Sequence, residues 1–397
     1  MNKIDELIQQ YCPDGVEYVK LGDVCKTLQK GTLTTKELVE PDGNNYPVIN
    51  SGRELYGYYP QFNNEGDAIT VAARGEYAGY ITYFSERFWA GGLCYPYRSS
   101  SSALSTKFIF YYLKSRQKYI RNTLVAEGSI PALNKGTLEQ FEIPLPPLPV
   151  QEAIVNILDR FAVYTAELQA ELQAELQARQ QQYNYYRDTL LSFEGREDVQ
   201  WKKLGEVASI KTGRRFVRTD IRESGVPCFH YGDIYTYYGL TATKTKGYLD
   251  AELASKLRFA QPNDVVVVCA GENDMDIGVG VAWLGDEPAV IHDACCILHH
   301  EQNPRYISHF LRTHNYHLQM KRYVKNGKIS SLPASGLAEA LIPIPSLEEQ
   351  EKIANILDHF DTLVNDLSQG LPAEIEARQQ QYEYYRDQLL TFKRKEA

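Results

Sequence analysis

The segments Arg179-Gln180-Gln181-Gln182-Tyr183 and Arg378-Gln379-Gln380-Gln381-Tyr382 are identical in sequence and lie in opposite halves of a chain of 397 residues. When they are extended to Ile143–Phe193 and Ile342–Phe392, the two stretches align without a gap, with roughly 29 of 51 positions identical. Such a match over a fixed offset indicates an internal repeat. The chain therefore contains two near-identical connectors, each preceded by a globular block.

A weaker repeat opens each half, because Lys20-Leu21-Gly22-Asp23-Val24 resembles Lys203-Leu204-Gly205-Glu206-Val207. Between these openings and the connectors, residues 32–126 and 215–324 show little similarity to each other. The two blocks thus differ in sequence, whereas the two connectors are nearly identical. We therefore expect the blocks to carry the specificity of the protein.

The connectors are predicted to be helices that bury one face. Apolar residues recur at spacings of three and four in both connectors, as in Ile154, Ile157, Leu158 and Phe161 and in Ile353, Ile356, Leu357 and Phe360. The first helix contains Ala-Glu-Leu-Gln three times in tandem, from Ala166 to Gln177. In the second, Ser346 and Glu349 have the spacing of a capping box, and Pro372 is expected to break or kink the helix.

Two interpretations of these helices are open. They could form a generic antiparallel coiled-coil hairpin, used as a dimerisation handle. Alternatively, they could pack together within one chain and hold one globular block at each end, with pseudo-twofold symmetry. The equal length and spacing of the two repeats favour the second interpretation, and such a molecule could span a linear polymer.

Each block is predicted to consist of short strands with turns, followed by a helix. In the first block we expect strands over 67–72 and 79–84 around the turn Arg74-Gly75-Glu76, and a helix from Lys107. In the second we expect strands over 264–269 and 280–284, and a helix over Tyr306–His317.

The predicted fold class is therefore α+β. Two mixed α/β domains alternate with two long helices packed as an antiparallel coiled coil, in a pseudo-twofold internal repeat. The expected boundaries are 1–145 for the first domain, 146–195 for the central connector helix, 196–343 for the second domain and 344–397 for the C-terminal connector helix.

The composition excludes several classes of protein. A chain with 43% hydrophobic and 23% charged residues is neither disordered nor collagen-like. No apolar run is long enough for a membrane helix, and the first residues lack the core of a signal peptide, so we expect a cytoplasmic protein with no membrane partner. The seven cysteines are scattered without a C-x-x-C pair and are expected to be reduced, buried thiols.

The formal net charge of −9 is distributed unevenly. By count it is −1 over 1–145, −5 over 146–200, +2 over 201–343 and −5 over 344–397. Nonspecific attraction to phosphates should therefore be weak. Any affinity for DNA must come from local clusters or from a partner.

Basic clusters of this kind lie in both blocks. They are Lys114, Arg116, Lys118 and Arg121; Arg214, Arg215, Arg218 and Arg222; and Lys321, Arg322, Lys325 and Lys328. Any one cluster alone fits a solvated face, but their recurrence favours contacts with DNA phosphates. The 29 tyrosines fit half-buried sheet positions, or, beside Arg and Lys on loops, a surface that contacts bases and phosphates.

The sequence contains no recognisable catalytic motif. It lacks the Asn/Asp-Pro-Pro-aromatic loop of adenine methyltransferases and a P-loop, and Ile277-Gly278-Val279-Gly280 lacks the third glycine of a dinucleotide fingerprint. A metal site could be imagined at His292-Asp293, Cys295-Cys296 and His299-His300. These pairs lie in a predicted strand, whose alternation would send their side chains to opposite faces, so we expect no metal site. No catalytic residue, metal or other cofactor is assigned.

The whole chain resembles the specificity (S) subunits of Type I restriction-modification systems. The resemblance rests on the order of variable block, helix, variable block and helix, and on the Ile-Pro-x-Pro-x-x-x-x-Gln-Glu entry to each helix. It also rests on the paired Arg-Gln-Gln-Gln-Tyr-x-Tyr-Tyr-Arg-Asp-x-Leu-Leu segments and on the tandem Ala-Glu-Leu-Gln quartets.

The resemblance implies that each block is a target recognition domain that reads one half of an asymmetric bipartite site in double-stranded DNA, and that the helices set the separation of the half-sites. It implies two methyltransferase (M) subunits, which methylate adenine N6 with S-adenosylmethionine after flipping the base, and two restriction (R) subunits, which cleave DNA with ATP. The chain itself would not be catalytic.

Candidate DNA contacts follow from the basic clusters and from one turn. They are Arg74, Lys114, Arg116, Lys118, Arg121, Arg214, Arg215, Arg218, Lys321, Arg322, Lys325 and Lys328, with Arg74, Arg214 and Arg215 as the best candidates for reading bases. The Tyr-Tyr-Arg-Asp segments are identical in both helices and cannot encode two different half-sites. Their region is assigned to helix packing or M-subunit docking, through Tyr183, Tyr186, Arg187, Tyr382, Tyr385 and Arg386.

Two alternatives remain at this point. The chain could be a structural coiled-coil adaptor whose blocks bind proteins, or a specificity subunit of a lone methyltransferase without R subunits. Sequence-specific protection of DNA in the presence of an M subunit would distinguish the adaptor from the specificity subunit.

Overall fold

The computed structural model describes residues 3–271, 277–325, 327, 329–365 and 370–396, without the side chains of residues 3–5 and 235. The chain divides into two compact units, Met1–Gln169 with Ala377–Ala397, and Ala170–Glu376. Each unit contains one globular block together with parts of both connectors.

The first unit is built around an antiparallel sheet of order β2-β8-β5-β6 and a second sheet of order β4-β3-β7. Its strands are β1 (Glu17–Lys20), β2 (Cys25–Thr27), β3 (Tyr46–Ile49), β4 (Gly57–Tyr59), β5 (Ala68–Ala72), β6 (Ile81–Phe84), β7 (Trp89–Ala90), β8 (Cys94–Ser99), β9 (Val125–Ala126), β10 (Ala132–Leu133) and β11 (Glu142–Leu145). Its short helices are α1 (Lys3–Tyr11), α2 (Leu21–Val24), η1 (Thr35–Glu37), α3 (Thr106–Ser115), α4 (Gln117–Tyr119), η2 (Ile120–Leu124) and α5 (Lys135–Glu139). Strands β5 and β6 and helix α3 confirm the elements predicted for this block.

The second unit repeats this plan. A five-stranded sheet has the order β13-β22-β18-β20-β15, and a four-stranded sheet has the order β16-β14-β21-β17. Its strands are β12 (Gln200–Lys203), β13 (Ala208–Thr212), β14 (Val226–Phe229), β15 (Thr241–Ala242), β16 (Gly247–Leu249), β17 (Phe259–Ala260), β18 (Val265–Val268), β19 (Ala270–Gly271), β20 (Gly280–Trp283), β21 (Ala289–Ile291), β22 (Cys295–His300), β23 (Ser330–Ser331) and β24 (Leu341–Ile344). Its short helices are α7 (Leu204–Val207), η3 (Arg218–Asp220), α8 (Tyr231–Thr236), α9 (Ala251–Ala254), α10 (Pro304–Phe310), α11 (His314–Met320) and α12 (Ala334–Leu337).

One predicted element of the second unit was wrong. A single helix was expected over Tyr306–His317, whereas the structure has α10 and α11. The Thr313 side chain accepts a hydrogen bond from the backbone N–H of Tyr316 at 3.3 Å, so this residue starts a new helix instead of continuing the first. The strands predicted over 264–269 and 280–284 are confirmed as β18 and β20.

The connectors are long helices, as predicted. The first is α6 (Leu148–Leu190), and the second is described as α13 (Leu347–Asn365) and α14 (Leu371–Leu389). Pro372 stands in the first turn of α14, where its missing N–H costs no helical hydrogen bond. The backbone N–H of Glu349 donates to Ser346 Oγ at 3.3 Å, which is one half of the predicted capping box.

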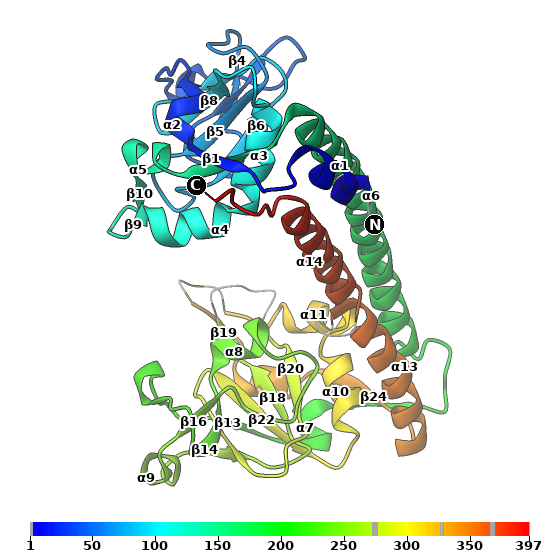
Figure 1. Ribbon diagram of the computed structural model, residues 1–397. Coiled ribbons are helices and arrows are strands. Elements are labelled where there is room, and N and C mark those ends of the chain that lie inside the picture. Colours follow the sequence, from blue (N-terminus) through cyan, green and yellow to red (C-terminus); the bar gives the residue numbers. More distant parts are fainter. Residues whose placement is uncertain (1–2, 272–276, 326, 328, 366–369, 397) are drawn as a thin grey trace. The chain divides into compact units, whose positions relative to one another are not determined.

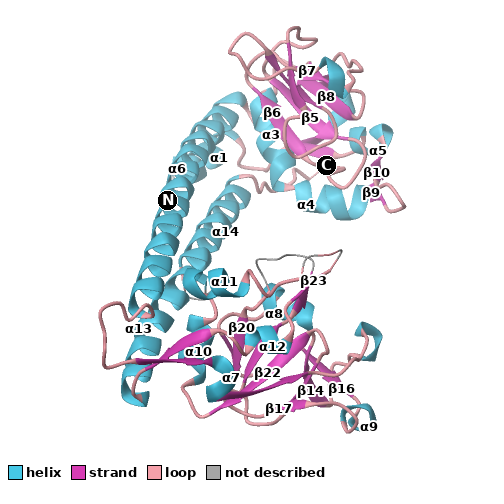
Figure 2. Cartoon of the chain, turned by 180° about the vertical axis from the view of Figure 1, so that it is seen from behind, coloured by secondary structure: helices cyan, strands magenta, loops and turns pink. Residues whose placement is uncertain are grey.

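Within each unit the connectors complete the hydrophobic core. In the first unit, Ile154 and Leu158 of α6 join Leu390 and Phe392 in the core of the block. In the second unit, Leu357 of α13 joins residues from the end of α6 in the same way. In each block a helix, α3 or α10, lies between the main sheet and a connector, as Figures 1 and 2 show.

The pairing of the connectors inside the first unit is antiparallel. Gln169 Nε2 donates to Gln379 Oε1 at 2.8 Å, while the Phe161 and Tyr385 rings meet edge to face at 6.3 Å. From the Phe161–Tyr385 contact to the Gln169–Gln379 contact, the residue number rises along α6 and falls along α14, so the two helices run in opposite directions. In the second unit, Tyr186 stacks on Phe360 at 5.3 Å, the matching pair of the repeat. These contacts support the intramolecular interpretation of the helices.

The end of a connector is joined to the start of a block differently in the two units. In the second, the chain runs continuously from the end of α6 into β12. In the first, the backbone N–H of Val16 donates to the Lys393 carbonyl and that of Lys395 donates to the Val16 carbonyl, both at 2.9 Å. Arg394 also forms an ion pair with Glu142 at 2.5 Å. A noncovalent contact thus takes the place of a chain connection.

The seven cysteines are free and buried, which confirms the sequence-based prediction. No described helix is long and apolar enough to cross a membrane.

Candidate nucleic-acid interface

Arg74 occupies an exposed turn between β5 and β6, as predicted. The next residue, Gly75, has φ +91°, a conformation that side chains disfavour, so this position permits the tight turn. The Arg74 backbone pairs with Ala132. The guanidinium is therefore held at the edge of the first block by a fixed backbone, a suitable position for a group that reads a base edge.

The position that matches Arg74 in the second block holds an uncharged residue. Leu133 N donates to the Ala73 carbonyl in the first block, and Leu332 N donates to the Cys269 carbonyl in the second, both at 2.8 Å. These bonds make Ala73 equivalent to Cys269, and hence Arg74 equivalent to Ala270. The same backbone feature presents different chemistry in the two blocks.

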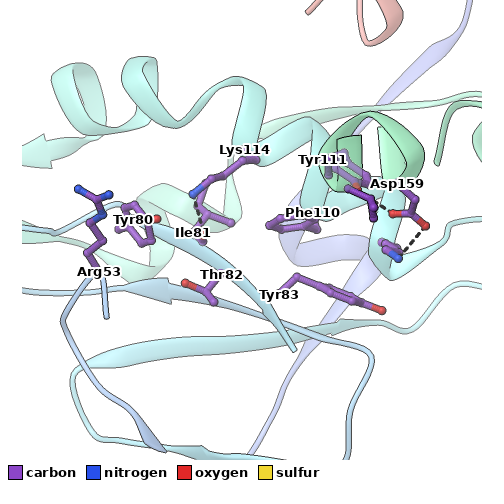
Figure 3. Close-up of a pocket in the computed structure, with 12 residues that line it drawn as sticks. Arg53, Tyr80, Ile81, Thr82, Tyr83, Phe110, Tyr111, Lys114 and Asp159 are labelled. Carbon is purple, nitrogen blue, oxygen red and sulfur yellow. Dashed lines mark hydrogen bonds and ion pairs between the residues drawn. The ribbon is translucent and has the colours of Figure 1, made fainter. Parts of the chain in front are cut away.

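Lys114 is committed to contacts inside the first unit, although its cluster was predicted to contact phosphates. Its ammonium donates to the Ile81 carbonyl at 2.9 Å and lies 3.9 Å from the centre of the Tyr80 ring (Figure 3). It also donates to Gln117 Oε1 at 3.0 Å. Burial, together with nearby arginines, lowers the pKa of Lys114 to about 8. These contacts position the start of β6 against α3.

The other basic residues of this cluster follow on α4 and η2. Lys118 is exposed, whereas Arg116 and Arg121 are half-buried. The Arg116 guanidinium lies 5.6 Å from the centre of the Tyr112 ring. Lys118 is thus the most accessible cation of the group.

In the second block, Arg214, Arg215 and Arg218 are all exposed. Arg214 donates to the Lys256 carbonyl at 2.7 Å, so its guanidinium is already engaged. Arg215 and Arg218 line a cavity of about 520 Å³, together with Phe216, Val217, His230, Tyr231, Ala270, Gly271, His292, Asp293, Ala294 and Ile329. The presence of the two histidines at this site was not predicted from the sequence.

Three residues of the last cluster follow α11 on the surface. Lys321, Arg322 and Lys325 are exposed, and the Arg322 guanidinium lies 4.8 Å from the Tyr323 ring centre. Lys328 lies outside the described residues. Their place after the second block's helices matches that of the first cluster after α3.

The residues assigned to docking separate into two groups. Tyr183 is only 2% exposed, and its hydroxyl lies 3.2 Å from His309 Nδ1, while Arg187 covers its ring at 5.5 Å. In the matching place of the first unit, Tyr382 is half-buried and Arg386 is buried. Tyr183 therefore attaches a connector to a block, and in both connectors the arginine packs on the tyrosine four residues before it.

The outward-facing aromatic side chains belong to the second group. Tyr186 and Tyr385 are partly exposed, at 38% and 47%. Their neighbours Tyr185 and Tyr384 are 66% and 61% exposed. The last two were absent from the predicted docking set. Repetition of the Tyr-Tyr pair in both helices was the signal that could have identified them.

Two residues of each connector, a glutamine and an aspartate, attach it to its block, and both occupy equivalent positions in the two connectors. Gln151 accepts from Ser105 N at 2.9 Å and donates to the Ala103 and Pro146 carbonyls; it is fully buried. Gln350 is also fully buried and makes the matching bonds to Asn303 N, Gln302 Oε1 and the Pro345 carbonyl. Ser105 and Asn303 are the N-caps of α3 and α10.

The second pair is Asp159 and Asp358. Asp159 accepts from Tyr111 at 2.7 Å and pairs with Lys107 at 2.8 Å (Figure 3). Asp358 contacts His309 at 2.8 Å and Arg305 at 2.5 Å. These contacts hold the pKa of the Asp358 carboxyl below its usual value against the opposing effect of burial. Within the described part of the chain, no group of three or more His, Cys, Asp or Glu residues could hold a metal ion.

Comparisons with known proteins agree with this architecture. A family profile described as "Type I restriction modification DNA specificity domain" matches residues 13–178 and 196–377, once in each half. The type I restriction enzyme EcoR124I/EcoR124II specificity subunit of Escherichia coli is 30% identical, over 96% of this chain and 95% of its own length. A putative type I specificity subunit of Haemophilus influenzae is 29% identical, over 95% of this chain and 96% of its own.

The fold is also found among solved structures. A chain from a structural study of complex assembly and conformational transition of the type I restriction-modification system matches with a TM-score of 0.68. The match has 18% identity and covers 95% of this chain and 98% of the other.

Proposed function

Because this chain belongs to the family of Type I restriction-modification DNA specificity proteins, we propose that its two globular blocks are target recognition domains that read the two halves of an asymmetric bipartite site. The chain is a specificity subunit and is not itself catalytic. One observation carries the proposal about asymmetry. The blocks share a backbone plan yet differ at equivalent surface positions, as at Arg74 and Ala270.

The proposed recognition domains are 1–145 and 196–343, and the connectors are 146–195 and 344–397. The four-part division is compatible with the mounting contacts. Gln151 and Asp159 attach the first domain to the start of α6, and Gln350 and Asp358 attach the second to α13. The same part of the connector repeat thus holds a different domain in each half.

The remaining basic residues are assigned to phosphates. Lys118, Lys321 and Lys325 are exposed. Phosphate contacts position a protein on the duplex and carry no sequence information directly. Substitution of one of these lysines should weaken binding to all DNA sequences alike, whereas substitution of a base-reading arginine should relax one position of the site.

The exposed tyrosines are the proposed docking surface for methyltransferase subunits. In the first unit, Phe161, Tyr164, Tyr385 and Leu389 line an apolar hollow of about 400 Å³. Aromatic side chains in a hollow are typical anchors of protein interfaces. Because Tyr185-Tyr186 and Tyr384-Tyr385 repeat this surface, two M subunits are expected, each supplying adenine-N6 methylation with S-adenosylmethionine. Two R subunits would add ATP-dependent cleavage.

The Ala-Glu-Leu-Gln quartets are proposed to set the spacer between half-sites. Each quartet adds about 6 Å of helix, against about 3.4 Å for each base pair of DNA. The repeat lies in the middle of α6, within Ala166–Gln177 and away from the mounting residues. Its length can therefore vary without changing how either domain is held.

The test is co-expression with the M subunit of the same system, followed by single-molecule sequencing of host DNA for N6-methyladenine. An asymmetric, gapped motif that depends on this chain supports the proposal. A soluble complex that produces no motif contradicts it and favours the coiled-coil adaptor. Addition of R subunits then separates a restriction system, which cleaves unmodified DNA, from a lone methyltransferase.

A further inference from the structure

The cavity lined by Arg215 and Arg218 lies where two strands of the second recognition domain end. Strands β14 and β21 are parallel neighbours, with Phe229 opposite Ile291. The next residues on the two strands are His230 and His292, so their side chains emerge side by side. Their ring centres are 4.9 Å apart, and the Tyr231 ring lies 4.6 Å from that of His230.

The first recognition domain has the same backbone at this place but no such cavity wall. Strands β3 and β7 are also parallel, with Ile49 opposite Ala90. Gly91 N donates to the Ile49 carbonyl at 2.8 Å, as His292 N donates to the Phe229 carbonyl at 3.2 Å. Asn50 is therefore the equivalent of His230, and Gly91 is the equivalent of His292.

These equivalent residues are used internally in the first domain. Asn50 Oδ1 accepts from Leu93 N at 2.9 Å. It also lies so near Gly91 that an added Cβ would be only 2.6 Å away. In the first domain the Asn50 side chain thus occupies this position, whereas in the second domain the position is lined by aromatic rings and two guanidinium groups.

The side chains that line the cavity favour a ligand that accepts hydrogen bonds. His230 Nδ1 accepts from Gly232 N at 3.3 Å. Burial, with a contribution from Arg218, lowers the pKa of His230, although the Asp233 carboxylate opposes this. A neutral imidazole that accepts at Nδ1 carries its proton on Nε2 and donates from there. Among the described residues, His230 Nε2 has no hydrogen-bond partner.

The arginines at the cavity add donors. Neither the Arg215 nor the Arg218 guanidinium forms an ion pair or a hydrogen bond with any residue that the structure describes. Asp293 also lines the cavity and adds one carboxylate acceptor, because the nearby His292 Nδ1 already accepts from Ala294 N at 3.1 Å. The two guanidinium groups and His230 Nε2 outnumber this acceptor. The available groups are therefore mainly donors.

We propose that His230, Arg215 and Arg218 determine the specificity of the second recognition domain by reading a guanine in the major groove. Guanine is the base that presents two acceptors and no donor there, O6 and N7, and arginine is its commonest partner. The wall formed by His292, Phe216 and Tyr231 fixes the donors, because packed rings restrict the rotamer of His230. This assignment rests on the proposed function of the chain and adds a base to it.

The experiment compares methylated motifs in cells that express the full chain with its M subunit. The variants are His230→Asn, which installs the residue of the first domain, and Arg215→Ala. Each should make one guanine of a single half-site degenerate, with discrimination at that position reduced between about 5-fold and 150-fold. The other half-site should not change.

Two controls define the result. Lys256→Ala removes an exposed cation of the same domain that belongs to none of the basic clusters and already pairs with Glu252 at 3.0 Å, and its motif should equal that of the wild type. Arg74→Ala should relax the opposite half-site. If His230→Asn abolishes methylation through misfolding, Arg215→Ala decides, because its exposed side chain makes no contact that folding requires.

Four outcomes would overturn the inference. They are an unchanged motif in both variants, relaxation of a base other than guanine, uniform loss of methylation at all sites in Arg215→Ala, or a wild-type motif whose affected half-site holds no guanine. A wild-type chain that yields no motif at all is a different failure, since it contradicts the proposed function.

Discussion

Substitution of Gln350 by alanine should release the second recognition domain from its connector. The fully buried amide joins three elements: it accepts from Asn303 N at 3.0 Å, and donates to Gln302 Oε1 at 2.8 Å and to the Pro345 carbonyl at 2.9 Å. Alanine leaves the N–H and the carbonyl without this partner, and each unsatisfied buried group costs about 1–3 kcal/mol. Because Asn303 is only half-buried, we expect a loss of roughly 2–4 kcal/mol.

The internal repeat predicts the same effect for the equivalent glutamine of the first connector. Gln151 is equally buried and makes the same kinds of bond, to Ser105 N and to the Ala103 and Pro146 carbonyls. Gln151→Ala should therefore cost about as much as Gln350→Ala, although the two domains share little sequence.

Urea unfolding of the purified chain measures the loss, and hydrogen exchange localises it. The amide of Asn303 should exchange faster in Gln350→Ala, by about 10-fold for each 1.4 kcal/mol, while that of Ser105 should not change. Gln388→Ala is the control, since this glutamine is exposed on α14 and its loss should cost within about 0.5 kcal/mol. Stability of Gln350→Ala equal to that control would refute the mounting role.

Four further predictions test other parts of the molecule. Deletion of one Ala-Glu-Leu-Gln quartet should shorten the spacer of the methylated motif by one or two base pairs and leave both half-sites unchanged; altered half-sites with a fixed spacer would exclude the ruler role. Tyr185→Ala and Tyr384→Ala should weaken binding of M subunits in titration calorimetry, whereas Tyr183→Phe, which loses the bond to His309, should lower stability by about 1 kcal/mol and leave binding intact. Arg74→Ala should relax one position of the half-site read by the first domain, at a cost of about 1–3 kcal/mol measured by competition between duplexes. Because the pKa of Lys114 falls from 10.5 to about 8 on folding, the unfolded chain binds more protons between these values, so stability should rise with pH across that window; Lys114→Met should lack this part of the rise in urea midpoints.

Much of the architecture could be predicted from the sequence, because the evidence for it is local or periodic. The stripe that includes Ile154 and Leu158 predicted a helix, and both residues are fully buried in the first core. Helix α14 begins at Leu371, so Pro372 stands in its first turn, where proline is tolerated. The division of the Tyr306–His317 segment into α10 and α11 was not predicted, because it depends on Thr313 capping a helix inside an otherwise periodic stretch.

The candidate site was less predictable, because it depends on pairings between distant segments. His230 and His292 meet only through the parallel pairing of β14 and β21, for which the sequence has no local signal. Lys114 belonged to a basic cluster in sequence, yet its side chain turns inward to the Ile81 carbonyl and the Tyr80 ring. Charge in a sequence shows what a residue can bind, whereas the fold decides whether that charge is available.

The mounting contacts explain how the connectors stay the same while the domains diverge. Gln151 and Gln350 bind mainly backbone atoms at the N-termini of α3 and α10, and every sequence that forms such a helix supplies those atoms. Asp159 and Asp358 do depend on side chains, but a cation and a hydrogen-bond donor four residues apart satisfy both: Lys107 with Tyr111, and Arg305 with His309. A new recognition domain thus needs only a capped helix and this pair to fit the same connector. The surface that we propose to read DNA, where Asn50 and Gly91 in one domain are replaced by His230 and His292 in the other, does not take part in these contacts. It can therefore change without altering how the domain is attached to its connector.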